Sequence, residues 1–226
     1  MTPPHIICHM ITSLDGRLAT ERWPVSEETL LEIYDQAAAE IAADGWIVGR
    51  ATMAEFMQTG APGISETPRP RPDQPGRAAG RRLGICFDRL GRLRPEGEDL
   101  EGDHLVLVLS EQVSDAHVAY LTGMGISVFF SGPEGDALGP ALARIGAAFG
   151  VHRLLLEGGG QLNGAFLAAG LIDETSTLIY PVVDGQGGVP AIYDHGGATT
   201  AGALELISTQ TRDHGVVWLR HRLARG

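Results

Sequence analysis

Short apolar runs alternate with segments of helical spacing along most of the chain. Seven runs have the length and apolar content of buried strands, namely residues 5–12, 46–49, 83–87, 104–109, 126–130, 154–156 and 174–180. Helical spacing follows the N-cap residue Ser26, and it recurs near residues 116–122 and 137–149. This alternation predicts a three-layer α/β/α fold, in which helices cover both faces of a mostly parallel central sheet.

Two parts of the chain depart from this alternation. Residues 203–211 and 216–222 alternate apolar and polar positions around a turn-forming segment, which predicts an antiparallel C-terminal hairpin. Residues 58–80 are rich in proline and predict an extended surface loop that follows a helix at residues 50–57. A length of 226 residues suits one large α/β domain, so we expect a single domain over residues 1–226.

Composition narrows the classes of function. The formal net charge of −11 argues against a nucleic-acid partner. All 17 basic residues are arginines, and the cluster between residues 69 and 94 is either a solvated loop or a phosphate clamp. The two cysteines lie in apolar runs, which predicts buried thiols and no zinc site. No apolar run approaches the roughly 20 residues that span a bilayer. The N-terminus lacks the features of a signal peptide, so we expect a cytoplasmic protein.

The segment from Leu154 to Asn163 combines a strand, an acid, three glycines and the start of a helix. Glycine lets the backbone approach a ligand closely, and the free N–H groups of a helix start favour an anion. Loops 12–17 and 49–52 also follow predicted strands, so all three loops are expected at the carboxyl edge of the sheet, where α/β proteins bind nucleotides. A plain glycine turn is the alternative. The loop is not a Walker loop, because no lysine follows the glycines.

Five motifs carry a resemblance to a known family. They are, in chain order, Thr12-Ser13-Leu14-Asp15-Gly16-Arg17, Arg22-Trp23, Val48-Gly49-Arg50-Ala51-Thr52-Met53, Leu156-Glu157-Gly158-Gly159-Gly160 and Leu171-Ile172-Asp173-Glu174. The chain resembles the reductase (C-terminal) domain of the bacterial riboflavin-biosynthesis deaminase–reductases (RibD), which have the dihydrofolate-reductase-like fold. The similarity extends over nearly the whole chain. It implies an NADPH-dependent reductase that acts on a pyrimidine-related substrate and forms a homodimer.

The motifs also imply where the cofactor binds. The expected cofactor-binding residues are Thr12, Trp23, Gly49, Arg50, Thr52, Arg89, Gly159, Gly160, Gln161, Leu162 and Asn163. Arg89 falls where the family binds the adenosine end, and a guanidinium there is suited to gripping a 2′-phosphate and selecting NADPH over NADH. Trp23 is either a wall for the nicotinamide or an aromatic residue of the core.

Three side chains are candidates for proton transfer to the substrate, namely Glu157, His9 and Asp15. Glu157 falls where the family places a substrate-facing acid, and the alternative is an acid that caps the strand end. His9 replaces the lysine of riboflavin-pathway members and is either an orienting or proton-giving imidazole or a structural residue. Phe56 replaces the acid that usually follows the Thr52 position. The segment that grips a ribosyl phosphate in the family has no clear counterpart.

We therefore predict an NADPH-dependent reductase that transfers a hydride to a pyrimidine, pterin or similar small heterocycle. One alternative is a stand-alone 5-amino-6-(5-phosphoribosylamino)uracil reductase of riboflavin biosynthesis. Another is a noncatalytic NADP-binding module, which the departures at His9 and Phe56 motivate. We expect no metal ion, nucleic acid or membrane among the partners.

Overall fold

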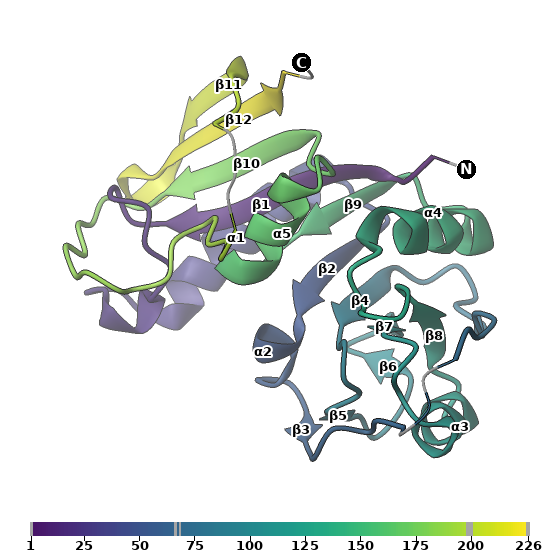
Figure 1. Cartoon of the computed structure of the whole chain (residues 1–226). Coiled ribbons are helices and arrows are strands. Elements are labelled where there is room, and N and C mark those ends of the chain that lie inside the picture. The colour runs from purple at the N-terminus through teal and green to yellow at the C-terminus, as the bar shows by residue number, and fades with distance from the viewer. Residues whose placement is uncertain (1, 66, 68, 198–200, 225–226) are drawn as a thin grey trace. The chain divides into compact units, whose positions relative to one another are not determined.

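The computed structural model describes residues 2–65, 67, 69–197 and 201–224 (Figure 1). The chain divides into two compact units. The middle unit combines Met1–Pro4 with Asp44–Leu154, and the terminal unit combines His5–Ala43 with Leu155–Gly226. Among the described residues, no helix is long and apolar enough to cross a lipid bilayer.

The middle unit contains a mostly parallel sheet. Its parallel strands pair in the order β2 (Gly45–Gly49), β4 (Leu83–Phe87), β7 (Asp103–Leu109) and β8 (Ser127–Phe130). The short strand β6 (Asp99–Leu100) pairs antiparallel with β7, and a separate antiparallel pair joins β3 (Gln58–Thr59) to β5 (Leu93–Arg94). Strands β4 and β8 are buried along their whole length, which explains why their sequences contain no polar residue except Ser127 at the start of β8.

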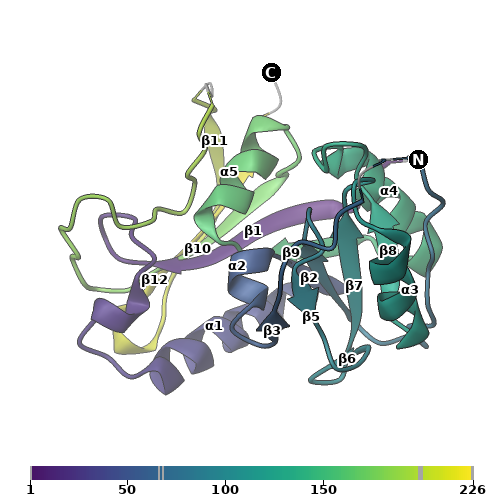
Figure 2. The ribbon, with the colours of Figure 1, turned by 60° about the horizontal axis from the view of Figure 1, so that its bottom comes forward.

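Three helices complete the middle unit. Helix α2 (Arg50–Met53) follows β2 directly, with Gly49 as its N-cap. Helix α3 (Asp115–Gly123) is capped by the Ser114 hydroxyl, which accepts a hydrogen bond from the His117 amide, and α4 (Leu138–Phe149) ends at a left-handed glycine. Helices α3 and α4 pack against β8 (Figures 1 and 2). The register pairs Gly49 with Phe87, so the residues that follow β2 and β4 share one edge of the sheet.

The terminal unit is built on β1 (His5–Thr12) and β10 (Glu174–Ile179), which pair in parallel. Strand β12 (Val217–Leu223) pairs antiparallel with β10, and β11 (Leu204–Thr211) pairs antiparallel with β12. The short helices η1 (Thr20–Arg22) and η2 (Asp213–Gly215) belong to connections in this unit. Strand β9 (Arg153–Leu156) contains the boundary between the two units, and Glu157 follows it directly.

Helices α1 (Glu27–Ile41) and α5 (Gly160–Ala168) lie on opposite sides of β1 and β10 (Figure 2). The Ser26 hydroxyl caps α1 by accepting a hydrogen bond from the Thr29 amide. The buried face of α1 recurs at helical spacing and comprises Leu30, Ile33, Ala37 and Ile41. Tyr34 lies beside this face, and its ring packs against the His9 ring of β1 at 4.3 Å between centroids.

The predicted α/β class, mostly parallel strands and antiparallel C-terminal hairpin are confirmed. Two details differ. The helix predicted at residues 50–57 is a single turn, Arg50–Met53. The two-residue strands β3, β5 and β6 are absent from the prediction, since such short pairs leave no periodic signal.

Candidate functional site

A cavity of about 230 Å³ lies in the terminal unit between β1, α1 and the residue that follows β9. Its lining is mostly apolar and comprises Met10, Ile11, Leu18, Thr20, Glu27, Leu30, Leu31, Tyr34 and Glu157. The acid of the glycine loop therefore faces a cavity of small-molecule character, as expected for a binding pocket with few polar groups. Tyr34 is a residue that the sequence analysis did not single out.

Tyr34 joins the first strand to Glu157. Its hydroxyl donates a hydrogen bond to the His9 carbonyl oxygen at 2.8 Å, and it also makes a hydrogen bond with the Glu157 side chain. Burial, and next the charge of Glu157, raise the pKa of Tyr34 well above its usual value. The phenol is therefore protonated across the physiological pH range. Its helical spacing made Tyr34 look like a core position, although a buried tyrosine needs a partner for its hydroxyl.

His9 is completely buried and its ring is engaged on both sides. Its Nδ1 lies 2.9 Å from the Ser176 hydroxyl and its Nε2 lies 3.3 Å from the Tyr34 carbonyl oxygen. Because a carbonyl only accepts, Nε2 carries the proton and Nδ1 accepts from Ser176, whose oxygen in turn accepts from Trp218 Nε1 at 2.8 Å. Burial lowers the pKa of His9 to about 4, so the ring is neutral near pH 7.

Asp15 lies on an exposed turn after β1. Its carboxylate accepts hydrogen bonds from the Ser13 hydroxyl at 2.7 Å and from the amides of Asp184 and Gly185 at 3.0 and 2.9 Å. These hydrogen bonds, with the one from Ser13 strongest, lower the pKa of Asp15 to about 2. The carboxylate therefore ties the turn to residues 184–185 and is ionised at neutral pH.

Thr12 and Trp23, two predicted cofactor residues of this unit, are both buried. The Thr12 hydroxyl donates to the backbone oxygens of Ser13 and Arg17, which closes the turn after β1. The Trp23 ring stacks on Tyr180 with 5.9 Å between centroids. Trp23 Nε1 is buried and has no hydrogen-bond partner among the described residues, a costly state for an indole nitrogen.

The glycine loop forms the start of α5, with Gly159 as the N-cap. A Cβ at Gly160 would lie 2.2 Å from the Ala191 carbonyl oxygen, so only glycine fits there. Asn163 is buried and its amide donates to the Ile192 carbonyl at 3.0 Å, whereas Gln161 is exposed and Leu162 is half-buried. In the described part of the chain, the amides of Gly160 and Gln161 have no hydrogen-bond partner. Two free N–H groups at a helix start favour an anion.

The remaining predicted cofactor residues, Gly49, Arg50, Thr52 and Arg89, belong to the middle unit. The parallel register of β2 and β4 brings their segments to one edge of the sheet. Arg89 is exposed, and its stem packs on Gly135, where a Cβ would lie 2.3 Å from Arg89 Cγ. Its guanidinium makes no ion pair or hydrogen bond within the described residues, and is available to a ligand phosphate.

Asp88, beside Arg89, is a functional candidate that the sequence analysis did not identify. It is completely buried, and one carboxylate oxygen accepts from the Leu93 amide at 2.7 Å. Its other oxygen, Oδ1, has no partner among the described residues. Burial raises the pKa of Asp88, and backbone hydrogen bonds from Leu93 and Arg92, followed by the charge of Arg50, oppose this change. The only sequence signal is its position at the end of β4.

The mostly parallel α/β sheet with its antiparallel C-terminal hairpin, and the acid of the glycine loop on a mostly apolar pocket, are the fold and the site expected of a reductase domain. The family model of the RibD C-terminal domain matches residues 4–218, so the chain belongs to the RibD C-terminal domain family. The single match therefore extends through both units.

Individual relatives agree with this assignment. The chain is 26% identical to the 2,5-diamino-6-ribosylamino-4(3H)-pyrimidinone 5′-phosphate reductase of Methanothermobacter thermautotrophicus over 80% of each chain. It superposes on a pyrimidine reductase-like protein of Corynebacterium diphtheriae with a TM-score of 0.72 at 16% identity, covering 99% of this chain and 93% of that one. RibD of Acinetobacter baumannii gives a TM-score of 0.69 at 20% identity, covering 98% of this chain and 58% of that chain. The two structural likenesses establish the fold.

Proposed function

We propose that residues 1–226 form one reductase domain that uses NADPH to reduce a small pyrimidine-like heterocycle of riboflavin biosynthesis. Membership of the RibD C-terminal domain family supports an oxidoreductase, and a relative named as a pyrimidinone phosphate reductase supports this substrate class. The observation that carries the proposal is the contact of Glu157 with Tyr34 on the wall of a mostly apolar cavity.

Glu157 is the proposed proton donor. The Tyr34 hydroxyl has one proton, which it gives to the His9 carbonyl, a group that can only accept. The phenol oxygen can accept a second hydrogen bond, and we assign to it the carboxyl proton of Glu157. Tyr34 thus favours the neutral acid, which is the form that can protonate a substrate imine or carbonyl during hydride transfer.

The other two candidates have supporting roles in this proposal. His9 holds the backbone and side chain of Tyr34 in place through its carbonyl and its Nε2–H group. Asp15 holds the turn after β1 against residues 184–185. Neither is a proton donor of useful acidity near pH 7, because the lowered pKa values, about 4 for His9 and about 2 for Asp15, leave a neutral imidazole and a carboxylate.

NADPH is the proposed cofactor, and the residues present fit its charges. The free amides of Gly160 and Gln161 suit a phosphate, and the exposed, unpaired Arg89 suits a 2′-phosphate. When bound, the dinucleotide supplies the hydride, while the protein orients the substrate, excludes water and supplies the proton. Gly49, Arg50, Thr52, Thr12 and Trp23 remain proposed contacts from the resemblance to the family.

Oxidation of NADPH in the presence of candidate substrates tests this function. The panel should contain the phosphoribosylated diaminopyrimidinone, the corresponding aminouracil, and a dihydropterin. We expect oxidation with at least one of the two pyrimidines, and the preferred one identifies the step. Thermal stabilisation by NADPH without oxidation of any panel member would instead indicate the noncatalytic NADP-binding module. No stabilisation by either nicotinamide cofactor would contradict both.

We also propose that the chain is a cytoplasmic homodimer. Strand β11 lies at the end of the strand order of the terminal unit, with β12 as its paired neighbour. It exposes Leu204, Leu206 and Ile207, with Leu206 63% exposed. An edge strand with several exposed apolar side chains favours association. Light scattering after size-exclusion chromatography measures the mass of the unaltered chain and of the L206K variant. We expect a dimer that L206K dissociates, and a monomeric unaltered chain would contradict the proposal.

A further inference from the structure

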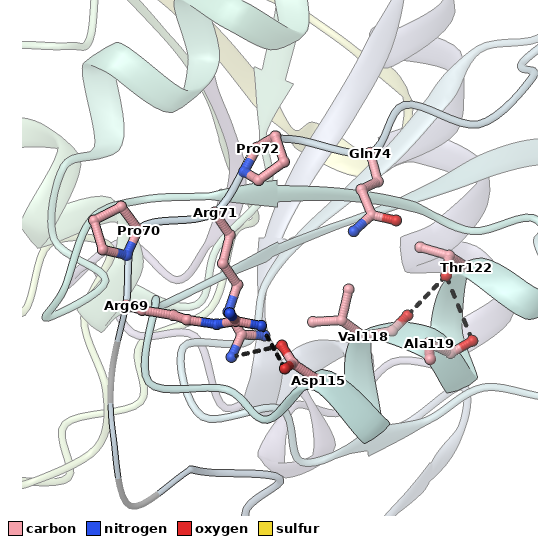
Figure 3. A pocket seen from close by; sticks show the side chains of 9 residues that line it. All are labelled: Arg69, Pro70, Arg71, Pro72, Gln74, Asp115, Val118, Ala119 and Thr122. Atoms are coloured by element: carbon pink, nitrogen blue, oxygen red, sulfur yellow. Dashed lines mark hydrogen bonds and ion pairs between the residues drawn. The ribbon is translucent and has the colours of Figure 1, made fainter.

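A second cavity, of about 400 Å³, lies in the middle unit between the proline-rich segment and helix α3 (Figure 3). Its lining comprises Arg69, Pro70, Arg71, Pro72, Gln74, Asp115, Val118, Ala119 and Thr122. None of the predicted cofactor or catalytic residues belongs to this lining. The segment is held in place by paired backbone hydrogen bonds between Gln74 and Val128 of β8, so one wall of the cavity is fixed to the sheet.

Arg71 is a buried cation with incomplete compensation. Its side chain is only 7% exposed, and Nη2 lies 3.2 Å from Asp115 Oδ1. Figure 3 shows its side chain reaching from the segment to the start of α3, beside Arg69. Within the described residues, Nε and Nη1 are buried without a hydrogen-bond partner. The Phe130 ring lies 5.8 Å from the guanidinium carbon and gives a weak cation–π contact that satisfies neither donor.

Two arginines share the one carboxylate of this cavity. Asp115 binds Arg69 Nη2 at 2.5 Å through its second oxygen, and its side chain is 67% exposed. The trio therefore carries one net positive charge, held on a guanidinium that has lost most of its water. Burying such a charge is unfavourable without a compensating anion. Arg71 and the 62% exposed Arg69 both line the cavity, so an anion in the cavity would lie beside this positive charge.

The other walls define the body of the ligand. Pro70, Pro72, Val118 and Ala119 are apolar, and the Thr122 hydroxyl is occupied by the carbonyl oxygens of Val118 and Ala119. A cavity of this size suits a small organic molecule rather than a single ion. We propose that this cavity binds a small organic oxyanion, with its phosphate or carboxylate on Arg71 and its apolar body against the prolines and α3.

Calorimetric titration at low salt with three probes tests the site. Phenyl phosphate and benzoate carry the two candidate head groups on a compact ring, and benzyl alcohol has the ring without the charge. We expect binding of at least one of the two anions and none of benzyl alcohol, with the tighter anion identifying the head group. NADPH should not compete. Absence of binding by both anions, or competition by NADPH, would overturn the proposal.

Variants locate the site on the structure. Arg71→Gln should raise the dissociation constant of the preferred anion by about tenfold or more, since it removes the buried charge. Ala119→Phe places a ring in the cavity from an exposed position of α3, so it should abolish binding without disturbing the arginines. Arg77→Gln is the matched control, because Arg77 is an exposed arginine of the same segment outside the lining. The melting temperature of each variant shows whether it is folded. If folded Arg71→Gln and Ala119→Phe bound the anion as tightly as the unaltered chain, the assigned site would be contradicted.

Discussion

His9 and Glu157 are two titratable side chains of the terminal unit that differ in what surrounds them. His9 lies in the core, where Ser176 and the Tyr34 carbonyl occupy both ring nitrogens. Glu157 lies on the wall of a cavity, beside a phenol whose proton is already donated elsewhere. The first arrangement fixes a neutral ring in one place, and the second puts a carboxyl group on the wall of a cavity, where we propose that it donates a proton. The proposed roles of the two side chains follow from their surroundings more than from their residue types.

Arginines of the middle unit also differ in whether other protein groups occupy their hydrogen-bond donors. Arg81 binds Glu98, Asp99 and the Ala78 carbonyl, so its donors are used inside the protein. Arg89 has no such partner within the described residues, and Arg71 has two donors without one. The proposed ligand contacts are therefore placed on Arg89 and Arg71, whereas Arg81 is assigned to the stability of the fold.

The largest expected effect is that of Glu157→Gln. If Glu157 supplies the proton, kcat/KM for the preferred substrate should fall by about 100-fold, because amides are not acids of useful strength. Glu27→Gln is the matched control, since Glu27 lines the same cavity from the first turn of α1. Steady-state rates and NADPH affinity should be measured together. Equal losses in both variants would mean that the cavity, and not the proton, was disturbed.

The next effect concerns stability and pH. The pKa of His9 is lowered in the folded protein, from its usual 6.5 to about 4, so the unfolded chain binds more protons between these values. The stabilisation is fully present above pH 6.5 and is lost as the pH falls toward 4. Near pH 5 we expect His9 to account for about 2 kcal/mol of the lost unfolding free energy.

Urea unfolding near neutral pH and near pH 5 measures this loss. His9→Gln removes the titrating group and should be less stable at neutral pH, yet it should lose less on acidification than the unaltered chain. His117 has a pKa that is also lowered to about 4 by burial, so part of the acid sensitivity remains in the variant. An identical pH dependence in both proteins would show that His9 is not held neutral by the fold.

A smaller effect is expected at Arg89. Arg89→Gln should raise the dissociation constant of NADPH by about tenfold and leave that of NADH unchanged, because only NADPH carries the 2′-phosphate. Arg81→Gln is the matched control, because Arg81 already pairs with Glu98 and Asp99. This variant should lower stability without changing cofactor selectivity. If Arg89→Gln weakened the binding of NADPH and of NADH equally, the assigned 2′-phosphate contact would be contradicted.

The sequence is sufficient for the fold class and insufficient for the roles inside the site. Strand and helix periodicity depend on local spacing, so the parallel strands and the hairpin could be predicted. The roles of His9 and Asp15 depend on Ser176 and on residues 184–185, which lie 167 to 170 positions away in the chain. No local pattern reports such partners. Tyr34 was missed for a related reason, because its helical spacing hides a hydroxyl that contacts a different element.

The smallest and most specific effect is that of Tyr34→Phe. This change keeps the ring that packs on His9 but removes the donor to the His9 carbonyl, which should cost about 1 kcal/mol of unfolding free energy. In the proposed arrangement it also removes the oxygen that accepts the Glu157 proton. The neutral acid then loses its hydrogen bond, so the pH above which kcat declines should move to lower values. The pH profile separates this role from mere packing. If stability falls while the profile stays in place, Tyr34 holds β1 to α1 but does not share the proton of Glu157.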